Sequence, residues 1–264
     1  MAKTQEQRDI FLEFLGKDTI LLFEGLGNLV HLFFETLSSI FKRRVKIKLV
    51  LEQMVKIGID SLPIALTSSF FVGMVFAVQI GGEFVKFGAS KYIGGVMGIA
   101  VARELAPALS GIVVASRVAA AISAELGTMK VTEQISALYA LGSNPIKYLV
   151  VPRFLACTIM LPLLTIIADI VCFFGAYLVV VYLINASGVD YMTSAQQLLK
   201  MSDIYGGIAK SFVFGMVISI IACYKGLNAK GGAKGVGEAT TSSVVASLLA
   251  LFVLNYFLSV LFFK

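Results

Sequence analysis

The sequence predicts an all-α integral membrane protein, with an N-terminal interfacial amphipathic helix, five transmembrane helices, and a short cytoplasmic helix between the second and third spans. Of its 264 residues, 58% are hydrophobic and only 14% are charged, and the mean hydropathy is +0.90. Soluble domains rarely combine these values. Several apolar stretches also reach the roughly 20 residues that a membrane-spanning helix needs.

Residues 1–48 form an N-terminal segment of their own in this prediction. Between residues 10 and 41 the polar side chains recur at steps of three, four or seven along one helical stripe: Glu13, Lys17, Glu24, Asn28, His31 and Glu35. The stripe leads into basic residues suited to anionic headgroups of the cytoplasmic leaflet: Lys42, Arg43, Arg44, Lys46 and Lys48. We therefore expect an interfacial helix, and packing of this helix against the protein's own bundle is a compatible alternative.

The remaining residues, 49–264, hold five apolar stretches with polar connections between them. The expected spans are about residues 61–82, 92–124, 148–184, 204–224 and 240–263. The second and third exceed the length of one span. We therefore expect them to tilt, to kink near Pro107 or Pro162, or to project beyond the bilayer.

The distribution of Lys and Arg predicts the orientation. Segment 42–56 and the loops 125–147 and 225–239 together hold eleven of these residues, whereas the opposite side holds four. The positive-inside rule then places the N-terminus and both loops in the cytoplasm and the C-terminus on the outer side. The first residues do not have the pattern of a secretory signal peptide, so we expect the first span to act as the insertion signal.

Three charged residues lie inside the second predicted span, in VARELAPALSGIVVASRVAA, residues 101–120. A charge at the bilayer centre costs about 2.5–3.5 kcal/mol on insertion scales. Arg117 is close enough to the cytoplasmic end to snorkel, whereas Arg103 and Glu104, near mid-span, need partners or a hydrated cavity. We expect Asp169 of the third span to pair with Arg103 and to leave Glu104 to the cavity. A buried ion cluster that only fixes helix register is the alternative.

A short helix is predicted in the loop that follows this span. Thr132 is its expected N-cap, Val131, Ile135 and Leu138 share one face, and Gly142 followed by Pro145 ends it. About ten helical residues are too few to cross a membrane. The helix is either a plain connector or the element on which a soluble motor acts.

The chain lacks the sequence patterns of several catalytic and binding classes. The Gly-rich stretch 226–242 contains no nucleotide-binding loop, the three cysteines do not have metal-ligand spacing, and the single His lies in the N-terminal segment. The net charge of +6 gathers beside hydrophobic segments, which favours a membrane surface over nucleic acid. We therefore expect no catalytic activity, cofactor or metal site in this chain, and no nucleic-acid partner.

One long stretch resembles a known family. ARELAPALSGIVVASRVAAAISAELGTMKVTEQISALYALGSNPIKYLVVPR, residues 102–153, is similar to the signature region of MlaE-type permeases, the transmembrane subunits of ABC transporters that work with MCE-domain proteins. The likeness extends with less specificity from about residue 45 to the C-terminus. It implies a homodimeric permease in a bacterial inner membrane, with its C-terminus periplasmic, that moves phospholipids or related lipids between inner and outer membranes and so maintains lipid asymmetry.

The resemblance also implies partners and sites. By this resemblance, a separate ABC ATPase binds the ATP and contacts the short helix, which then serves as a coupling helix. The residues expected to take part in coupling include Glu125, Thr132, Glu133, Ile135, Leu138 and Gly142. A periplasmic hexamer of MCE domains sits above the dimer, and a small STAS-domain protein can join the ATPase. The lipid pocket is expected to include Gln79, Arg103 and Glu104, with Arg117 and Asp169 as further intramembrane polar groups.

Two other functions remain open from the sequence alone. An ion-coupled secondary transporter or channel would use Arg103, Glu104 and Asp169 as a charge relay and would need no ATPase. A membrane scaffold would use the same charges only for assembly with partner proteins.

Overall fold

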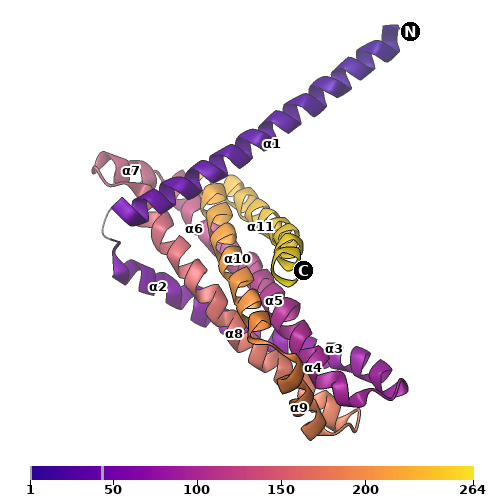
Figure 1. Cartoon of the computed structure of the whole chain (residues 1–264). Helices are drawn as coiled ribbons and strands as arrows, with labels where there is room; N and C mark the ends of the chain where they lie inside the picture. Colours follow the sequence, from indigo (N-terminus) through magenta and orange to yellow (C-terminus); the bar gives the residue numbers. More distant parts are fainter. Residues whose placement is uncertain (1, 43–44) are drawn as a thin grey trace.

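The computed structural model describes residues 2–42 and 45–264 (Figure 1), with side chains described for Ile20, residues 23–42 and residues 45–264. These residues are helical almost throughout and form no β-strand. Five of their helical rods are long and apolar enough to cross a membrane. The predicted all-α class with five spanning helices is confirmed.

The five rods cover the predicted apolar stretches, apart from residues 183–184, and most continue into polar flanking residues. The first rod contains α2 (Ile47–Gly58), η1 (Ile59–Ser61) and α3 (Leu62–Lys86). The second runs through η2 (Ser90–Tyr92), α4 (Ile93–Ala100), η3 (Val101–Leu105), α5 (Ala106–Val113), η4 (Val114–Val118) and α6 (Ala119–Val131). The third consists of η5 (Ile146–Val150) and α8 (Val151–Tyr182), and the last two are α10 (Met201–Leu227) and α11 (Gly232–Phe263).

Helix α8 lies at the centre of the bundle, with α3, α10 and α2 packed around it (Figure 1). The contact with α3 is close because Gly73 faces the backbone of Cys172 and Gly175 faces the backbone of Phe70. A Cβ atom at either glycine would overlap the facing chain. Small residues at such crossings let membrane helices approach each other. Pro162 lies inside α8, and the helix continues past it.

Helix α1 (Ala2–Lys42) is continuous across the predicted amphipathic segment, and its second half packs on the bundle. Leu32 and Thr36 are buried, and the Phe33 ring lies 6.0 Å from the Phe154 ring of α8. Of the predicted polar stripe, Glu24, Asn28 and His31 are exposed, whereas Glu13 and Lys17 lie outside the described side chains. The helix and its packing against the bundle are confirmed.

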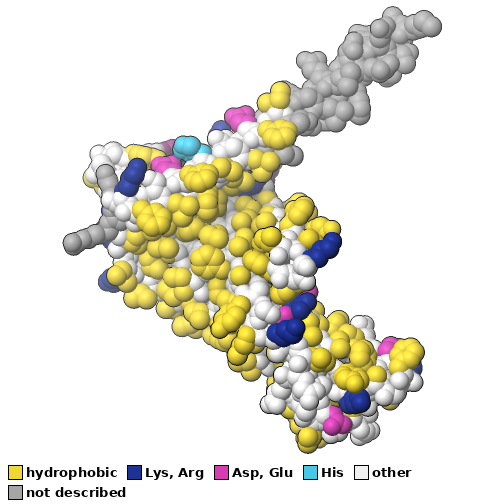
Figure 2. Space-filling view, in the orientation of Figure 1, with side chains coloured by type: hydrophobic (Ala, Val, Ile, Leu, Met, Phe, Trp, Pro, Cys, Tyr) yellow, Lys and Arg dark blue, Asp and Glu magenta, His cyan; other side chains and the backbone are white. Residues whose placement is uncertain are grey.

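The basic connection that the sequence indicates for residues 42–56 contains the amphipathic helix α2. Val50 and Ile57 are buried, whereas Lys48, Glu52 and Lys56 are exposed. Hydrophobic side chains dominate the visible surface of the bundle from α1 toward the end formed by α9 (Figure 2). Such a surface is expected of a protein whose solvent is lipid.

The short helix α7 (Gln134–Ala140) follows α6, as predicted, but Thr132 as its N-cap is wrong. Helix α6 continues to Val131, and the Thr132 hydroxyl donates a hydrogen bond of 2.8 Å back to the carbonyl of Thr128. Glu133 then turns the chain, with φ at +58°. The predicted end is confirmed: Gly142 has φ +69°, and the amides of Gly142 and Ser143 donate to the carbonyls of Tyr139 and Leu138.

Helix α9 (Gly188–Leu198) was not predicted, because residues 185–203 are too polar to resemble a span and too short to resemble a separate domain. It begins at Ser187, whose hydroxyl accepts a hydrogen bond from the amide of Asp190. Tyr191 is fully buried between Phe173 and Tyr177 of α8, and this burial raises the pKa of Tyr191 above its usual range. Helix α9 therefore belongs to the packed fold, at the opposite end from α7 (Figure 1).

Candidate functional site

The second rod changes its helical winding where Arg103 and Glu104 lie. Residues 101–105 form a π-helical turn, η3, and Pro107 follows at the start of α5. Proline has no N–H group, so Pro107 does not donate the usual α-helical hydrogen bond to the carbonyl of Arg103, four residues earlier. The ammonium group of Lys210 in α10 donates to this carbonyl at 2.8 Å. The predicted distortion near Pro107 thus takes the form of a π turn, a frequent feature of functional sites.

Arg103 forms an ion pair with Asp203 in the first turn of α10. Its Nε and Nη2 atoms donate to Oδ1 of Asp203 at 3.0 and 2.8 Å, and Asp203 is only 2% exposed. The other carboxylate oxygen, Oδ2, accepts the backbone amide of Lys200 at 3.0 Å, which caps α10. The guanidinium also lies 4.6 Å from the centre of the Phe263 ring. These contacts fix the position of Arg103.

Glu104 forms a second pair with Lys210, two helical turns after Asp203. The Lys210 side chain is fully buried, and its Nζ donates to Oε1 of Glu104 at 2.7 Å and to the Ser259 hydroxyl at 2.7 Å. Ser259 donates to Oε1 at 2.8 Å, and Asn255 of α11 donates to Oε2 at 3.0 Å. With the bond to the Arg103 carbonyl, all three donor hydrogens of the ammonium group have partners.

These residues form what we call the charged cluster: Arg103, Glu104, Asp203, Lys210, Asn255 and Ser259. It joins the first half of α10 and the last turns of α11 to η3, and so lies nearer to the α9 end of the bundle than to the α7 end. Glu104 stays 41% exposed, because it borders an open hollow of about 450 Å³. The other walls of the hollow come from α11 and include Phe252, Tyr256, Val260 and Phe263. The arrangement offers charge and apolar surface side by side.

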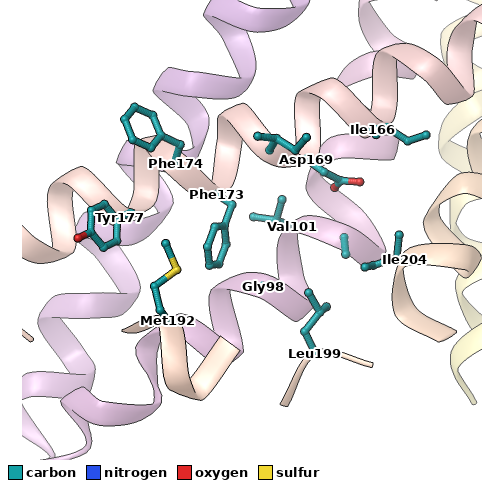
Figure 3. A pocket seen from close by; sticks show the side chains of 12 residues that line it. Gly98, Val101, Ile166, Asp169, Phe173, Phe174, Tyr177, Met192, Leu199 and Ile204 are labelled. Carbon is teal, nitrogen blue, oxygen red and sulfur yellow. The ribbon is translucent and has the colours of Figure 1, made fainter. Parts of the chain in front are cut away.

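The predicted pairing of Arg103 with Asp169 is wrong. Arg103 contacts Asp203 instead, because α10 brings a buried carboxylate to η3 and α8 places Asp169 in a different hollow, lined by Ile166, Phe173 and Met192 among others (Figure 3). The sequence analysis missed Asp203, Lys210, Asn255 and Ser259. Two spacings would have revealed them: Asp203 and Lys210 are seven residues apart on one helical face, and Asn255 and Ser259 are four apart.

Two other predicted pocket residues lie elsewhere. Gln79 is exposed on α3 and is not among the residues that line the hollow beside Glu104. Arg117, in the π turn η4, pairs with Asp60 at 3.4 Å and donates to the Ser61 hydroxyl at 3.0 Å. It therefore ties the second rod to η1 of the first rod, and snorkelling of Arg117 to the membrane surface stays a prediction.

The predicted coupling residues gather at the other end of the bundle. Glu125 of α6 pairs with Arg153 of α8 at 3.0 Å and approaches Lys56 of α2 at 3.8 Å. Arg153 is buried, so this pair joins the two helices that carry α7 between them. Within α7, Ile135 is buried and Leu138 is partly buried against the bundle, as predicted for one shared face. Glu133 and Gly142 shape the two ends of α7.

Comparisons with known proteins decide the family. The model of the family Permease MlaE matches residues 50–261. The chain belongs to the MlaE permease family. It is 44% identical, over 95% of this chain and 96% of the other, to a probable ABC transporter permease protein of Rickettsia typhi. It is 46% identical to one of Synechocystis, over 92% of this chain and 93% of the other.

A third relative has the name of a lipid. The chain is 43% identical over 225 residues to the chloroplast protein Trigalactosyldiacylglycerol 1 of Arabidopsis thaliana, covering 85% of this chain and 64% of that protein. The matched region of the MlaE family model contains both the charged cluster and α7. As a family of ABC transporter permeases, it identifies this chain as the membrane-spanning part of a transporter.

Proposed function

We propose that this chain is the permease subunit of an ATP-driven transporter that moves phospholipids or related lipids between the inner and outer membranes, and so maintains lipid asymmetry. The observation that carries the proposal is the charged cluster beside the apolar hollow. A lipid needs a polar group for its head and apolar surface for its chains, and the hollow offers both within one site. The Arabidopsis relative, whose name is that of a lipid, supports the same substrate class.

In this proposal Arg103, which adjoins Glu104 but is not among the residues that line the hollow, attracts an anionic headgroup at the edge of the hollow, and Glu104 binds a hydroxyl or ammonium group of the same head. Arg103 keeps 33% of its side chain exposed while Asp203 holds it in place, so its remaining donors are free to meet phosphate oxygens. Phe252, Tyr256 and Val260 then contact the acyl chains. Gln79 lies on the exposed face of α3, where it would complete the pocket only together with a second copy of the chain.

The energy comes from a separate ABC ATPase that binds the ATP and contacts α7. Tyr139 in α7 and Leu141 directly after it support this, because both large apolar side chains are exposed while Ile135 anchors the helix to the bundle. The ion pair between Glu125 and Arg153 would transmit a displacement of α7 to both α6 and α8. We further propose a homodimer, a periplasmic MCE hexamer at the α9 end, and a STAS-domain protein on the ATPase.

The proposed location is a bacterial inner membrane, with the N-terminus and α7 in the cytoplasm and the C-terminus in the periplasm. The excess of Lys and Arg on the α7 side supports this orientation. Helix α1 would lie in the membrane interface, because it exposes Phe23, Leu26, Val30 and Phe34 along one stripe.

The ion-coupled alternative needs a relay through Arg103, Glu104 and Asp169. It has less support, because Arg103 and Glu104 are held by Asp203 and Lys210 and Asp169 lines a different cavity.

Lipid transport by Arg103→Ala and Glu104→Ala variants tests the proposal. Each is expected to reduce ATP-dependent lipid transfer in proteoliposomes at normal expression, whereas the control Lys91→Ala, an exposed lysine outside the hollow, keeps it. Normal transfer by both cluster variants would overturn the proposed role of the site.

A further inference from the structure

A second cavity, of about 420 Å³, lies on the other side of η3 from the charged cluster. Its walls come from α4, η3, α8, α9 and the start of α10, and they are almost entirely apolar (Figure 3). Gly98, Val101, Phe173, Phe174 and Met192 are among the lining residues. The volume falls within the roughly 300–1,000 Å³ of ordinary small-molecule sites.

Among the described residues, Asp169 is the only charged one that lines this cavity, and its side chain points from α8 toward η3 (Figure 3). Its Oδ1 atom is buried and has no hydrogen-bond partner among the described residues. The nearest charged groups of η3 and α10 are already paired, Arg103 with Asp203 and Glu104 with Lys210. A buried carboxyl oxygen without a donor is unfavourable, so a bound molecule that brings a donor would gain from it.

The cavity opens toward the surroundings of the bundle. Ile166, Ile170 and Phe174 line it from α8, and all three are exposed large hydrophobic side chains. In a membrane these residues face lipid, so an amphiphile can reach the cavity sideways without passing through the hollow beside Glu104. The backbone of η3 separates the two sites, since Val101 and Ala102 line this cavity and Glu104 lines the other.

We propose that this cavity binds the alkyl chain of an amphiphile whose polar end carries a hydrogen-bond donor, a hydroxyl or a primary ammonium, for which Asp169 is the acceptor. A phosphate or carboxylate end is disfavoured, because it offers no donor and repels the carboxyl group. The apolar walls hold the chain, and Asp169 selects the head. The site is separate from the charged cluster, and its occupation does not require transport.

Photolabelling of the full chain in detergent tests the proposal without an ATPase. The probes are hexadecylamine and hexadecanol that carry a diazirine on the chain, and palmitic acid with the same diazirine is the control probe. We expect the amine and the alcohol to label residues 166–177 or Met192, and the acid to label them about tenfold less, the difference that one strong hydrogen bond gives.

Asp169→Leu is expected to remove the preference for the two donor probes, whereas the control Thr67→Leu, a polar-to-apolar change at an exposed position of α3 outside the cavity, keeps it. Gly98→Leu is a steric variant that fills the cavity, because a side chain at residue 98 points at Leu199 and Phe173. It should lower labelling by all probes.

Equal labelling by the three probes in the native chain, or unchanged labelling in Asp169→Leu, would overturn the role of Asp169. If Asp169→Leu does not fold, competition on the native chain decides: unlabelled octadecylamine should displace the probe, and stearate should not. Labelling that never falls on residues 166–177 or Met192 would overturn the site itself. Because only binding is measured, these results are independent of whether the cluster transports lipid.

Discussion

Glu104→Gln is expected to destabilise the protein more than Lys210→Met, although the two residues form one ion pair. In Glu104→Gln the ammonium of Lys210 remains fully buried and loses its counter-charge, which costs about 3–5 kcal/mol. In Lys210→Met the carboxylate of Glu104 remains, but it is 41% exposed and keeps the donors Ser259 and Asn255. Its cost is about 1–3 kcal/mol, that of an impaired hydrogen-bond network.

The double variant Glu104→Gln/Lys210→Met removes both charges and should regain most of the lost stability, because a buried ion pair replaced as a unit is often close to neutral. Its thermal stability should therefore exceed that of Glu104→Gln. The measure is the temperature at which half of the purified protein leaves the monodisperse peak in size-exclusion chromatography. The pair Glu83 and Lys86 is the matched control, because both side chains are well exposed and the same exchanges should change stability by less than about 1 kcal/mol.

Transport separates a functional cluster from a structural one. The double variant should stay folded and still lose most lipid transfer, because the carboxylate of Glu104, the charge of the cluster that lines the hollow, is gone. The reasoning would be refuted if Lys210→Met were as destabilising as Glu104→Gln, or if the double variant were as unstable as the sum of the two single changes. Full transport by a stable double variant would assign the cluster to helix register alone.

Three further results are expected. Gly94→Val should release α9 from α4, since a Cβ atom at residue 94 would overlap the backbone of Tyr191. Limited proteolysis between residues 185 and 200 should then be faster. The control Gly82→Val, at a glycine with open space around it, should leave the rate of proteolysis unchanged. Glu125→Gln should destabilise more than Arg153→Met, because it leaves the buried guanidinium unpaired; equal melting temperatures would contradict this. Ala137→Pro removes the hydrogen bond of 3.0 Å from the Ala137 amide to the Glu133 carbonyl and so disrupts α7. This change and Glu133→Lys should each uncouple the permease from its ATPase, read as lost stimulation of ATP hydrolysis; normal stimulation and copurification in both would count against α7 as the contact.

The spanning helices could be predicted because lipid imposes a simple rule. A helix of about 20 apolar residues makes its backbone hydrogen bonds internally and presents apolar side chains to the lipid. Hydropathy alone therefore locates it. The end of α7 was predictable for a similar reason, because Gly142 adopts the positive φ that glycine tolerates best. Its beginning was not, since Thr132 has two uses, as an N-cap or as a donor to its own helix, and the continuation of α6 selects the second.

The charged cluster was only half predictable. Arg103 and Glu104 stand out because charge in an apolar run is costly, but their partners depend on which helices touch η3. Asp169 of α8 and Asp203 of α10 are both carboxylates on helices that pack against the second rod. Which of them pairs with Arg103 depends on tertiary packing, which sequence periodicity does not encode. Lys210 was overlooked because a single lysine hardly alters the hydropathy of α10, although it completes the cluster.

The most direct test of the account is to isolate this chain from its native membrane in mild detergent and to identify the copurifying proteins and lipids by mass spectrometry. The account predicts an ABC ATPase and bound phospholipid with the native chain, and less phospholipid with the stable Glu104→Gln/Lys210→Met variant. Recovery of the chain without ATPase and without lipid would contradict the proposal that it is the permease of a lipid transporter.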